Sequence, residues 1–219
     1  MKAVLINEDD RSLSWGEFAT PEPGDNEILI KVHASAINRA DLMQRKGLYP
    51  PPPGASPVMG LECAGEVVEV GPGASRYSKG DRVCALLAGG GYAEYATVHE
   101  GSVLPVPEGL SFEQAAALPE VFATAWLNLF MEAGLKTGEK VILHAGASGV
   151  GTAGIQLCKA FQSPCFVTAG SKEKLDACIA LGAEGGSNRH EGSFLGSAQA
   201  FAGESGVDVI LDPVGGTTH

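Results

Sequence analysis

A glycine-rich turn between an apolar segment and a helical pattern constrains the fold more than any other feature. Val141–Leu143 is short, apolar and partly β-branched, which is typical of a strand buried on both faces. The pattern over Thr152–Ala160 predicts a helix, and the turn between them carries glycines at Gly146, Gly149 and Gly151. Strand, turn and helix form the unit that binds a dinucleotide pyrophosphate, because glycines let the backbone approach the phosphates. A purely structural turn uses glycine too, so the spacing alone leaves both interpretations open.

The chain after this turn alternates between strand and helix patterns. The expected segments are a strand Cys165–Thr168, a helix Lys172–Leu181 ended by Gly182, a weak strand near Ser187-Asn188, a helix Ser193–Ala202 and a strand Val207–Leu211. Such alternation predicts a parallel, doubly wound sheet. A helix over Pro119–Met131 precedes it, and its aromatic residues at helical spacing, Phe122, Trp126 and Phe130, are expected in the core.

The first half of the chain reads as short strands separated by turns. The expected strands are Ala3–Ile6, Glu27–Ala34, Gly65–Val70, Arg82–Leu87 and Tyr92–Val98, and they suggest a β-barrel or sandwich. Two segments differ. Ser35–Gly47 predicts a short helix stopped by its glycine, and Tyr49–Gly54 is a stiff proline run that cannot join a sheet. The run is either a rigid surface loop or a wall that holds Tyr49 over a pocket.

Charge and composition limit the classes of partner and the compartment expected for this protein. A formal charge of −11 argues against general binding of nucleic acids or anionic membranes, which needs basic patches. The five cysteines contain no CxxC pair, the N-terminus is too briefly apolar for a signal peptide, and no run approaches the length of a membrane span. We therefore expect reduced cysteines that serve as small core residues in a cytoplasmic protein.

Several motifs in order resemble one family. They are Asn38–Gly47, Pro51–Ser56, Gly60–Gly65, Val103–Leu110, Ala115–Pro119 and the His144–Gly151 turn. Together they resemble the quinone oxidoreductase branch of the zinc-independent medium-chain dehydrogenase/reductase superfamily. The resemblance implies an α/β fold with a β-barrel: a GroES-like catalytic domain at 1–122, part of a Rossmann NADPH-binding domain at 123–219, and a catalytic cleft between them.

The positions that bind zinc in related alcohol dehydrogenases differ here. The resemblance places Asn38 at a metal-binding cysteine of those relatives and Leu61 at a metal-binding histidine. Asparagine is a poor zinc ligand and leucine cannot be one. The chain also lacks a four-cysteine lobe, and its five histidines show no metal-site spacing. The sequence therefore predicts a mechanism without zinc.

The segment Thr168–Lys174 bears on the choice of cofactor. A site for NAD usually places a carboxylate about 20 residues after the glycine turn, on the ribose hydroxyls. Here the strand ends on small neutral residues, and Ser171 and Lys174 could donate to a 2′-phosphate. The carboxylate of Glu173 would repel a 2′-phosphate, unless the geometry of the helix directs this side chain away. NADPH is preferred to NADH, in agreement with the resemblance.

The predicted cofactor site combines the turn with residues implied by the resemblance. Thr124 lies near the nicotinamide in the family, and Arg189 replaces a tyrosine on the adenosine side, where it either adds a phosphate donor or is simply solvated. Ser148 replaces a glycine of the wider family and adds a hydroxyl. The predicted cofactor-binding residues are Tyr49, Thr124, Gly146, Ser148, Gly149, Val150, Gly151, Gly170, Ser171, Lys174 and Arg189.

The predicted function is transfer of hydride from NADPH directly to a small-molecule quinone, without metal. Tyr49 is expected to form a pocket wall, with Asn38 and Asp41 as polar groups near the reacting end. Each has a structural alternative: Asn38 as a helix N-cap, and Asp41 as a cap or an ion-pair partner of Arg45. Reduction of enoyl thioesters with the same cofactor is the competing enzymatic function.

The family continues at length beyond the segment that Asp212–Gly216 resembles. We therefore expect this chain to be truncated, without the last sheet strands and without the region through which the family dimerises. This leaves a third hypothesis open, a catalytically inactive product that acts through binding or not at all.

Overall fold

The computed structural model describes residues 1–215. The chain divides into two compact units, Met1–Glu120 and Val121–His219. No helix within the described residues is long and apolar enough to cross a membrane.

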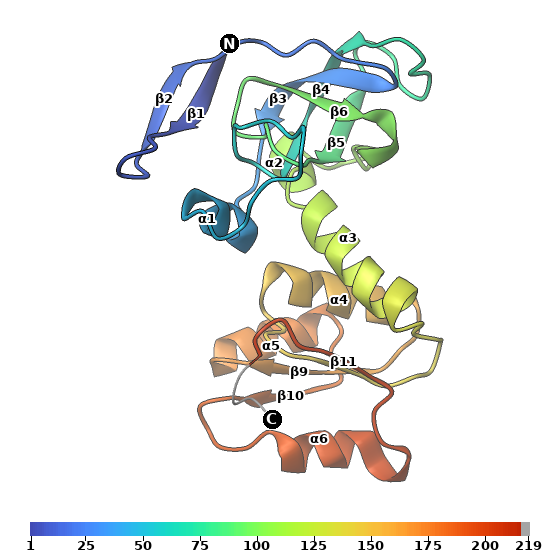
Figure 1. Ribbon diagram of the computed structural model, residues 1–219. Coiled ribbons are helices and arrows are strands. Elements are labelled where there is room, and N and C mark those ends of the chain that lie inside the picture. The colour runs from blue at the N-terminus through green and yellow to red at the C-terminus, as the bar shows by residue number, and fades with distance from the viewer. Residues whose placement is uncertain (216–219) are drawn as a thin grey trace. The chain divides into compact units, whose positions relative to one another are not determined.

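The first unit is built on a five-stranded antiparallel sheet (Figure 1). Its order is β6 (Tyr95–His99), β3 (Glu27–Ala34), β4 (Glu62–Val70), β5 (Arg82–Leu86) and β7 (Val103–Pro105). Alternate residues such as Ile28, Ile30 and Val83 are fully buried in its core, as the period of two along a strand requires. A separate antiparallel pair is formed by β1 (Lys2–Ile6) and β2 (Leu13–Glu17).

The sequence analysis did not predict β2 or β7. Most residues of β2 are exposed, so it lacks the apolar alternation that marks a strand. The three residues of β7 end on Pro105, and proline is a poor strand signal. Both strands form because a partner strand supplies the hydrogen bonds.

The first unit also contains short helices: α1 (Arg39–Arg45) and η1 (Glu100–Ser102) between strands, and α2 (Phe112–Ala115) after the last strand. The chain leaves α1 through Gly47, whose φ of +74° favours glycine. The proline run after it forms neither strand nor helix, and its residues from Tyr49 to Gly54 are exposed. The run is therefore an exposed loop, and Tyr49 stands on it with 48% of its surface exposed.

The second unit contains a four-stranded parallel sheet. Its order is β10 (Gly185–Asn188), β9 (Cys165–Ala169), β8 (Val141–Leu143) and β11 (Val209–Leu211). The first two strands along the chain lie in the middle and the order reverses at β8, which is the doubly wound arrangement. Figure 1 shows α4 (Gly149–Ala160) and α5 (Lys172–Leu181) on one face and α6 (Leu195–Ala202) on the other. The predicted parallel, doubly wound sheet is confirmed.

Both faces of this sheet are buried, which explains the continuous apolar runs of its central strands. Val141 and Val167 pack against Ile155 of α4. On the opposite face, Ile142 and Phe166 pack against α6. A strand covered on both faces keeps no polar alternation.

The helix α3 (Pro119–Trp126) continues into η2 (Leu127–Glu132), which has π-helical hydrogen bonds. The prediction that its aromatic stripe forms core is confirmed for Phe130, which packs against the core of the second unit, and is wrong for Trp126. Trp126 is 40% exposed, whereas Ala125 and Leu129 are fully buried. The fully buried residues therefore each lie one position before an aromatic residue.

Trp126 and Phe130 of this helix also form an aromatic cluster with Phe161. Trp126 stacks on Phe130 with ring centroids 4.7 Å apart, and Phe161 meets Trp126 edge-on at 5.4 Å. Such offset and edge-on contacts are favourable without full burial.

All five cysteines are buried and free: Cys63, Cys84, Cys158, Cys165 and Cys178. Burial raises the pKa of Cys63 to about 12 and that of Cys84 to about 11, so both thiols stay protonated. Their predicted role as small core residues is confirmed.

Candidate functional site

The glycine turn begins where β8 ends. Ala145 takes a left-handed conformation with φ of 52°, and the N–H of Gly146 donates to the carbonyl oxygen of Thr168 at 2.9 Å. A Cβ atom on Gly146 would lie 2.6 Å from Cβ of Val167. Glycine is therefore required here because the turn packs directly on β9.

The helix α4 begins at the end of this turn with Ser148 as its N-cap. The hydroxyl oxygen of Ser148 accepts a hydrogen bond from the N–H of Gly151 at 3.1 Å, and Ser148 and Gly149 are exposed. N–H groups in the first turn of a helix have no partner inside the helix and lie at the positive end of its dipole. The start of α4 can therefore bind an anion through Ser148, Gly149 and Val150.

Gly151 has a different role in the turn. A Cβ atom at this position would lie 2.5 Å from the carbonyl oxygen of Ala145 and 2.6 Å from backbone atoms of Gly146. Because these are backbone atoms, a side chain cannot be accommodated by rotation of a neighbour. Gly151 allows the turn to close onto the helix rather than contacting a ligand itself.

Three residues of the predicted adenosine side lie together at the ends of β9 and β10. Ser171 is the N-cap of α5 and its hydroxyl oxygen accepts from the N–H of Lys174 at 3.3 Å. A Cβ atom on Gly170 would lie 3.3 Å from Nη2 of Arg189, so this guanidinium lies over Gly170. Lys174 and Arg189 are both exposed. The structure thus brings Gly170, Ser171 and Arg189 into one neighbourhood.

Glu173 lies two residues after Ser171 in the first turn of α5. Its own backbone N–H and the Ser171 hydroxyl lower the pKa of the Glu173 carboxyl. A negative charge is therefore kept beside Ser171 in the first turn of α5. This negative charge would repel a 2′-phosphate bound at Ser171, whereas the cations of Lys174 and Arg189 would attract it.

In the first unit, Asn38 is the N-cap of α1 and forms a capping box with Asp41. The backbone N–H of Asn38 donates to Oδ2 of Asp41 at 2.7 Å. Asp41 is 2% exposed, so its carboxylate caps the helix inside the protein. Of the structural alternatives for Asp41, a helix cap or an ion pair with Arg45, the structure shows the cap. Arg45 donates through Nε to the carbonyl oxygen of Arg11 at 2.8 Å.

Glu62, the most deeply buried carboxylate beside this cap, was not predicted from the sequence. Glu62 is 1% exposed. Its Oε1 accepts from Nδ2 of Asn38 at 2.7 Å and its Oε2 accepts from the backbone N–H of Glu120 at 2.9 Å. A usable signal was present, because Glu62 is the one charged residue in Gly60–Gly65, and charged residues are rarely buried without a partner.

Burial raises the pKa of Glu62, and the negative charge of Asp41 adds to this shift. The hydrogen bonds from Glu120 and Asn38 oppose it. Tyr92 lies near the same carboxylates: its hydroxyl donates to the carbonyl oxygen of Ala36 at 3.1 Å, and burial, followed by the charge of Asp41, raises the pKa of its phenol. The region around Asn38 is therefore buried, polar and negatively charged.

Tyr49 and Thr124, which are both predicted to bind the cofactor, belong to different units. Tyr49 stands on the exposed loop of the first unit, and Thr124 lies half-buried in α3 of the second. The carbonyl oxygen of Thr124 accepts from Nδ2 of Asn128 at 2.8 Å.

Zinc does not fit the residues that the structure describes. Over residues 1–215, no group of three or more His, Cys, Asp or Glu side chains is placed to hold a metal ion. The side chain of Asn38 is engaged by Glu62, and Leu61 is buried and has no ligand atom. We therefore assign no step to a metal.

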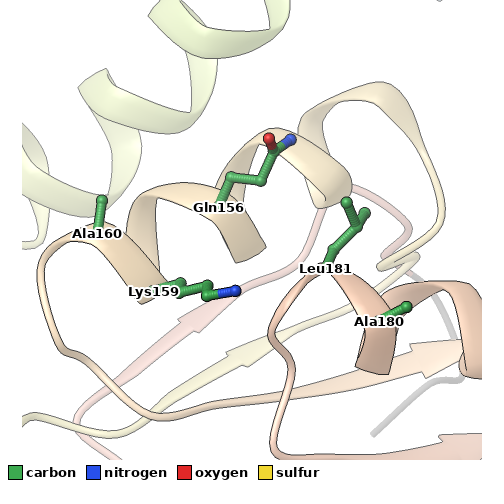
Figure 2. A pocket seen from close by; sticks show the side chains of 5 residues that line it. All are labelled: Gln156, Lys159, Ala160, Ala180 and Leu181. Carbon is green, nitrogen blue, oxygen red and sulfur yellow. The ribbon is translucent and has the colours of Figure 1, made fainter.

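A surface depression of about 610 Å³ lies between α4 and α5 (Figure 2). Gln156, Lys159, Ala160, Ala180 and Leu181 line it. These residues belong to the C-terminal halves of the two helices, whereas the cofactor residues predicted on α4 and α5 lie at or near their N-terminal ends. No predicted site residue lines this depression.

Two protein families match the chain. The family described as "Alcohol dehydrogenase GroES-like domain" matches residues 24–108, and "Zinc-binding dehydrogenase" matches residues 149–219. The predicted fold class, a GroES-like domain followed by a Rossmann domain, is confirmed.

Individual relatives agree with these matches. The quinone oxidoreductase of Sus scrofa is 38% identical over 197 residues, which are 90% of this chain and 60% of that protein. The Escherichia coli quinone oxidoreductase complexed with NADPH is 31% identical with a TM-score of 0.86, and the match covers 100% of this chain and 68% of that one. The CurK enoyl reductase is 30% identical with a TM-score of 0.88, covering 98% of this chain and 68% of that one.

The chain thus spans about 60% of the length of the curated quinone oxidoreductases that it matches. On these matches, it belongs to the quinone oxidoreductase branch of the medium-chain dehydrogenase/reductase superfamily.

Proposed function

We propose that the chain binds NADPH and reduces a quinone by direct hydride transfer, without a metal. The observation that carries the proposal is the start of α4, where Ser148 and exposed first-turn N–H groups follow a parallel strand at the point where the strand order reverses. Nucleotides bind at this place in doubly wound sheets. The relative from Escherichia coli, whose structure is complexed with NADPH, supports the choice of cofactor.

The residues of the second unit fit such a cofactor. Ser148, Gly149 and Val150 would hold the pyrophosphate through the hydroxyl and N–H groups, while Gly146 and Gly151 keep the turn compact. A 2′-phosphate would be held by Ser171, Lys174 and Arg189 over Gly170. Thr124 and Tyr49 would lie at the nicotinamide end. When bound, the cofactor supplies the hydride.

On the acceptor side, Asn38 is the donor that the proposal needs. Reduction of a quinone develops negative charge on its oxygen, and a preorganised N–H group stabilises that charge. Asn38 is half-buried and its amide nitrogen uses one hydrogen for Glu62, so the second hydrogen remains for the acceptor. Asp41 keeps Asn38 at the start of α1, and Tyr49 forms a wall that orients the ring.

Quinones and enoyl thioesters are the two acceptors to compare, because the CurK enoyl reductase shares the fold. The test is the initial rate of NADPH oxidation with 1,4-benzoquinone and, separately, with crotonyl-CoA. Turnover of the quinone with none of the thioester supports the proposal. Turnover of crotonyl-CoA alone overturns the choice of substrate, and turnover of neither favours an inactive product.

A further inference from the structure

The position of Glu62 gives it a role in the proposed reaction. We infer that Glu62 is a positioning residue, which holds the carboxamide of Asn38 by its nitrogen and thereby directs the second N–H of this amide to the acceptor's oxygen. This inference rests on the proposed reductase function and extends it to a residue that no part of the predicted site contained.

A carboxamide needs such a partner. Its oxygen and nitrogen ends have nearly the same shape, so a half-turn exchanges an acceptor for a donor at little steric cost. An ionised carboxylate only accepts, so Glu62 can be satisfied by the nitrogen end of Asn38 and not by its oxygen end. The distance of 2.7 Å from Nδ2 to Oε1 is typical of a strong bond to a charged group.

Glu62 is itself held in place. Its second oxygen accepts from the backbone N–H of Glu120, and the side chain extends from β4 in the centre of the sheet. With 1% of its surface exposed, Glu62 is shielded from water that could replace Asn38 as a partner. Both oxygens are occupied by protein donors, so Glu62 acts on a substrate only through Asn38.

The test uses a variant that exchanges donor and acceptor. In Asn38→Asp with Glu62→Gln, the new carboxylate at position 38 can cap α1 and accept from the new amide at 62, while the amide oxygen still accepts from Glu120. The number of bonds and the net charge are unchanged, but no side-chain N–H remains at position 38. In Glu62→Gln alone, the amide oxygen serves Asn38 or Glu120 but not both.

We expect Glu62→Gln to lower kcat for 1,4-benzoquinone by about tenfold or more, with KM for NADPH unchanged, because a mispositioned donor loses most of its effect. The double variant should recover the melting temperature to within about 2 °C of the wild type, roughly 1 kcal/mol or less, yet keep the low kcat. Recovery of kcat together with melting temperature would show that the pair is only structural. A lower melting temperature in Glu62→Gln with unchanged kcat would overturn the inference as well.

A readout without turnover separates this inference from the proposed function. In the wild type labelled with ¹⁵N-asparagine, one Nδ2 hydrogen of Asn38 should exchange slowly with solvent, and Glu62→Gln should remove this protection. If both hydrogens exchange like a free amide in an active wild type, the positioning role is wrong and the proposed function stands. If the wild type reduces neither acceptor, the proposed function fails, and the positioning role for it fails with it even where the protection is seen.

Discussion

The backbone N–H of Glu120 donates to Oε2 of Glu62 at 2.9 Å, across 58 residues of sequence. This bond joins β4, the central strand of the five-stranded sheet, to the start of α3 within the first unit. The carboxylate that accepts it is 1% exposed, and no ion pair within residues 1–215 involves it. The buried charge is therefore offset by two hydrogen bonds alone.

The raised pKa of Glu62 predicts a specific dependence of stability on pH. The folded state binds the proton of Glu62 more tightly than the unfolded state, in which the pKa of this carboxyl is 4.5. The contribution of Glu62 to the free energy of unfolding therefore falls as pH rises from about 4.5 through the folded pKa. Glu62→Gln should lack this decrease, measured by urea unfolding between pH 4 and 8. Equal slopes for wild type and variant would contradict the prediction.

Glu100→Gln is the matched control for that experiment. Two backbone N–H groups, from Arg76 and Ser75, donate to Glu100 at 2.8 Å and lower its pKa. The sign is opposite: this stabilisation is present above the unfolded value and is lost as pH falls through the folded one. The two variants should therefore change the pH profile in opposite directions.

Gly151→Ala should destabilise the second unit. Its Cβ would lie 2.5 Å from a backbone oxygen, and crowding of this kind costs about 1–3 kcal/mol. Gly196→Ala in α6 is the control, because no atom lies within 4 Å of its Cβ and the exchange should stabilise by about 0.4–1 kcal/mol. Chemical denaturation measures both, and equal effects would show that the turn tolerates a side chain.

Ser148→Ala should weaken both stability and cofactor binding. Loss of a helix N-cap costs about 1 kcal/mol, and the proposed phosphate contact is lost with the hydroxyl. Ser111→Ala removes the N-cap of α2, where Ser111 accepts from the N–H of Gln114, but it lies outside the predicted cofactor site. Calorimetric titration should show a higher Kd for NADPH only in Ser148→Ala. A similar Kd in both variants would remove Ser148 from the site.

Arg189→Ala tests the adenosine side. Loss of a charged donor to the 2′-phosphate should raise the Kd for NADPH about tenfold and leave that for NADH unchanged. Lys159→Ala is the control, since it removes one exposed cation at the far end of α4. If Arg189→Ala behaves like this control, Arg189 is merely solvated.

Glu173→Gln tests the opposing charge beside Ser171. The variant removes the carboxylate that the Ser171 hydroxyl and the backbone hold in the first turn of α5. NADPH should then bind more tightly relative to NADH, because repulsion of the 2′-phosphate is relieved. An unchanged ratio of the two Kd values would place the phosphate elsewhere.

Much of the second unit was predictable from its sequence because its signals are local. The helix Lys172–Leu181 has the bounds that were expected, with Gly182 at its end adopting φ of 130°. The strand Val141–Leu143 matches its apolar run, since both its faces are covered. In these elements the local sequence pattern and the observed fold agree.

The features that were missed depend on contacts between distant residues. The role of Glu62 comes from Asn38 and Glu120, which lie 24 and 58 residues away in the sequence. Trp126 was misassigned to the core because helical spacing alone does not tell which of two adjacent faces, that of Trp126 or that of Leu129, is the more deeply buried. Glu173 was left open because its orientation depends on the hydroxyl of Ser171.

The most direct test of the central claim is the melting temperature of the full chain with NADPH and with NADH at equal concentrations. A ligand at 100 times its Kd stabilises the folded state by about 2.7 kcal/mol, which is roughly 5–10 °C for a chain of this size. We predict a shift of this order with NADPH and a smaller one with NADH. No shift at saturating NADPH would contradict the proposed binding of this cofactor, and a larger shift with NADH would contradict the proposed preference for NADPH.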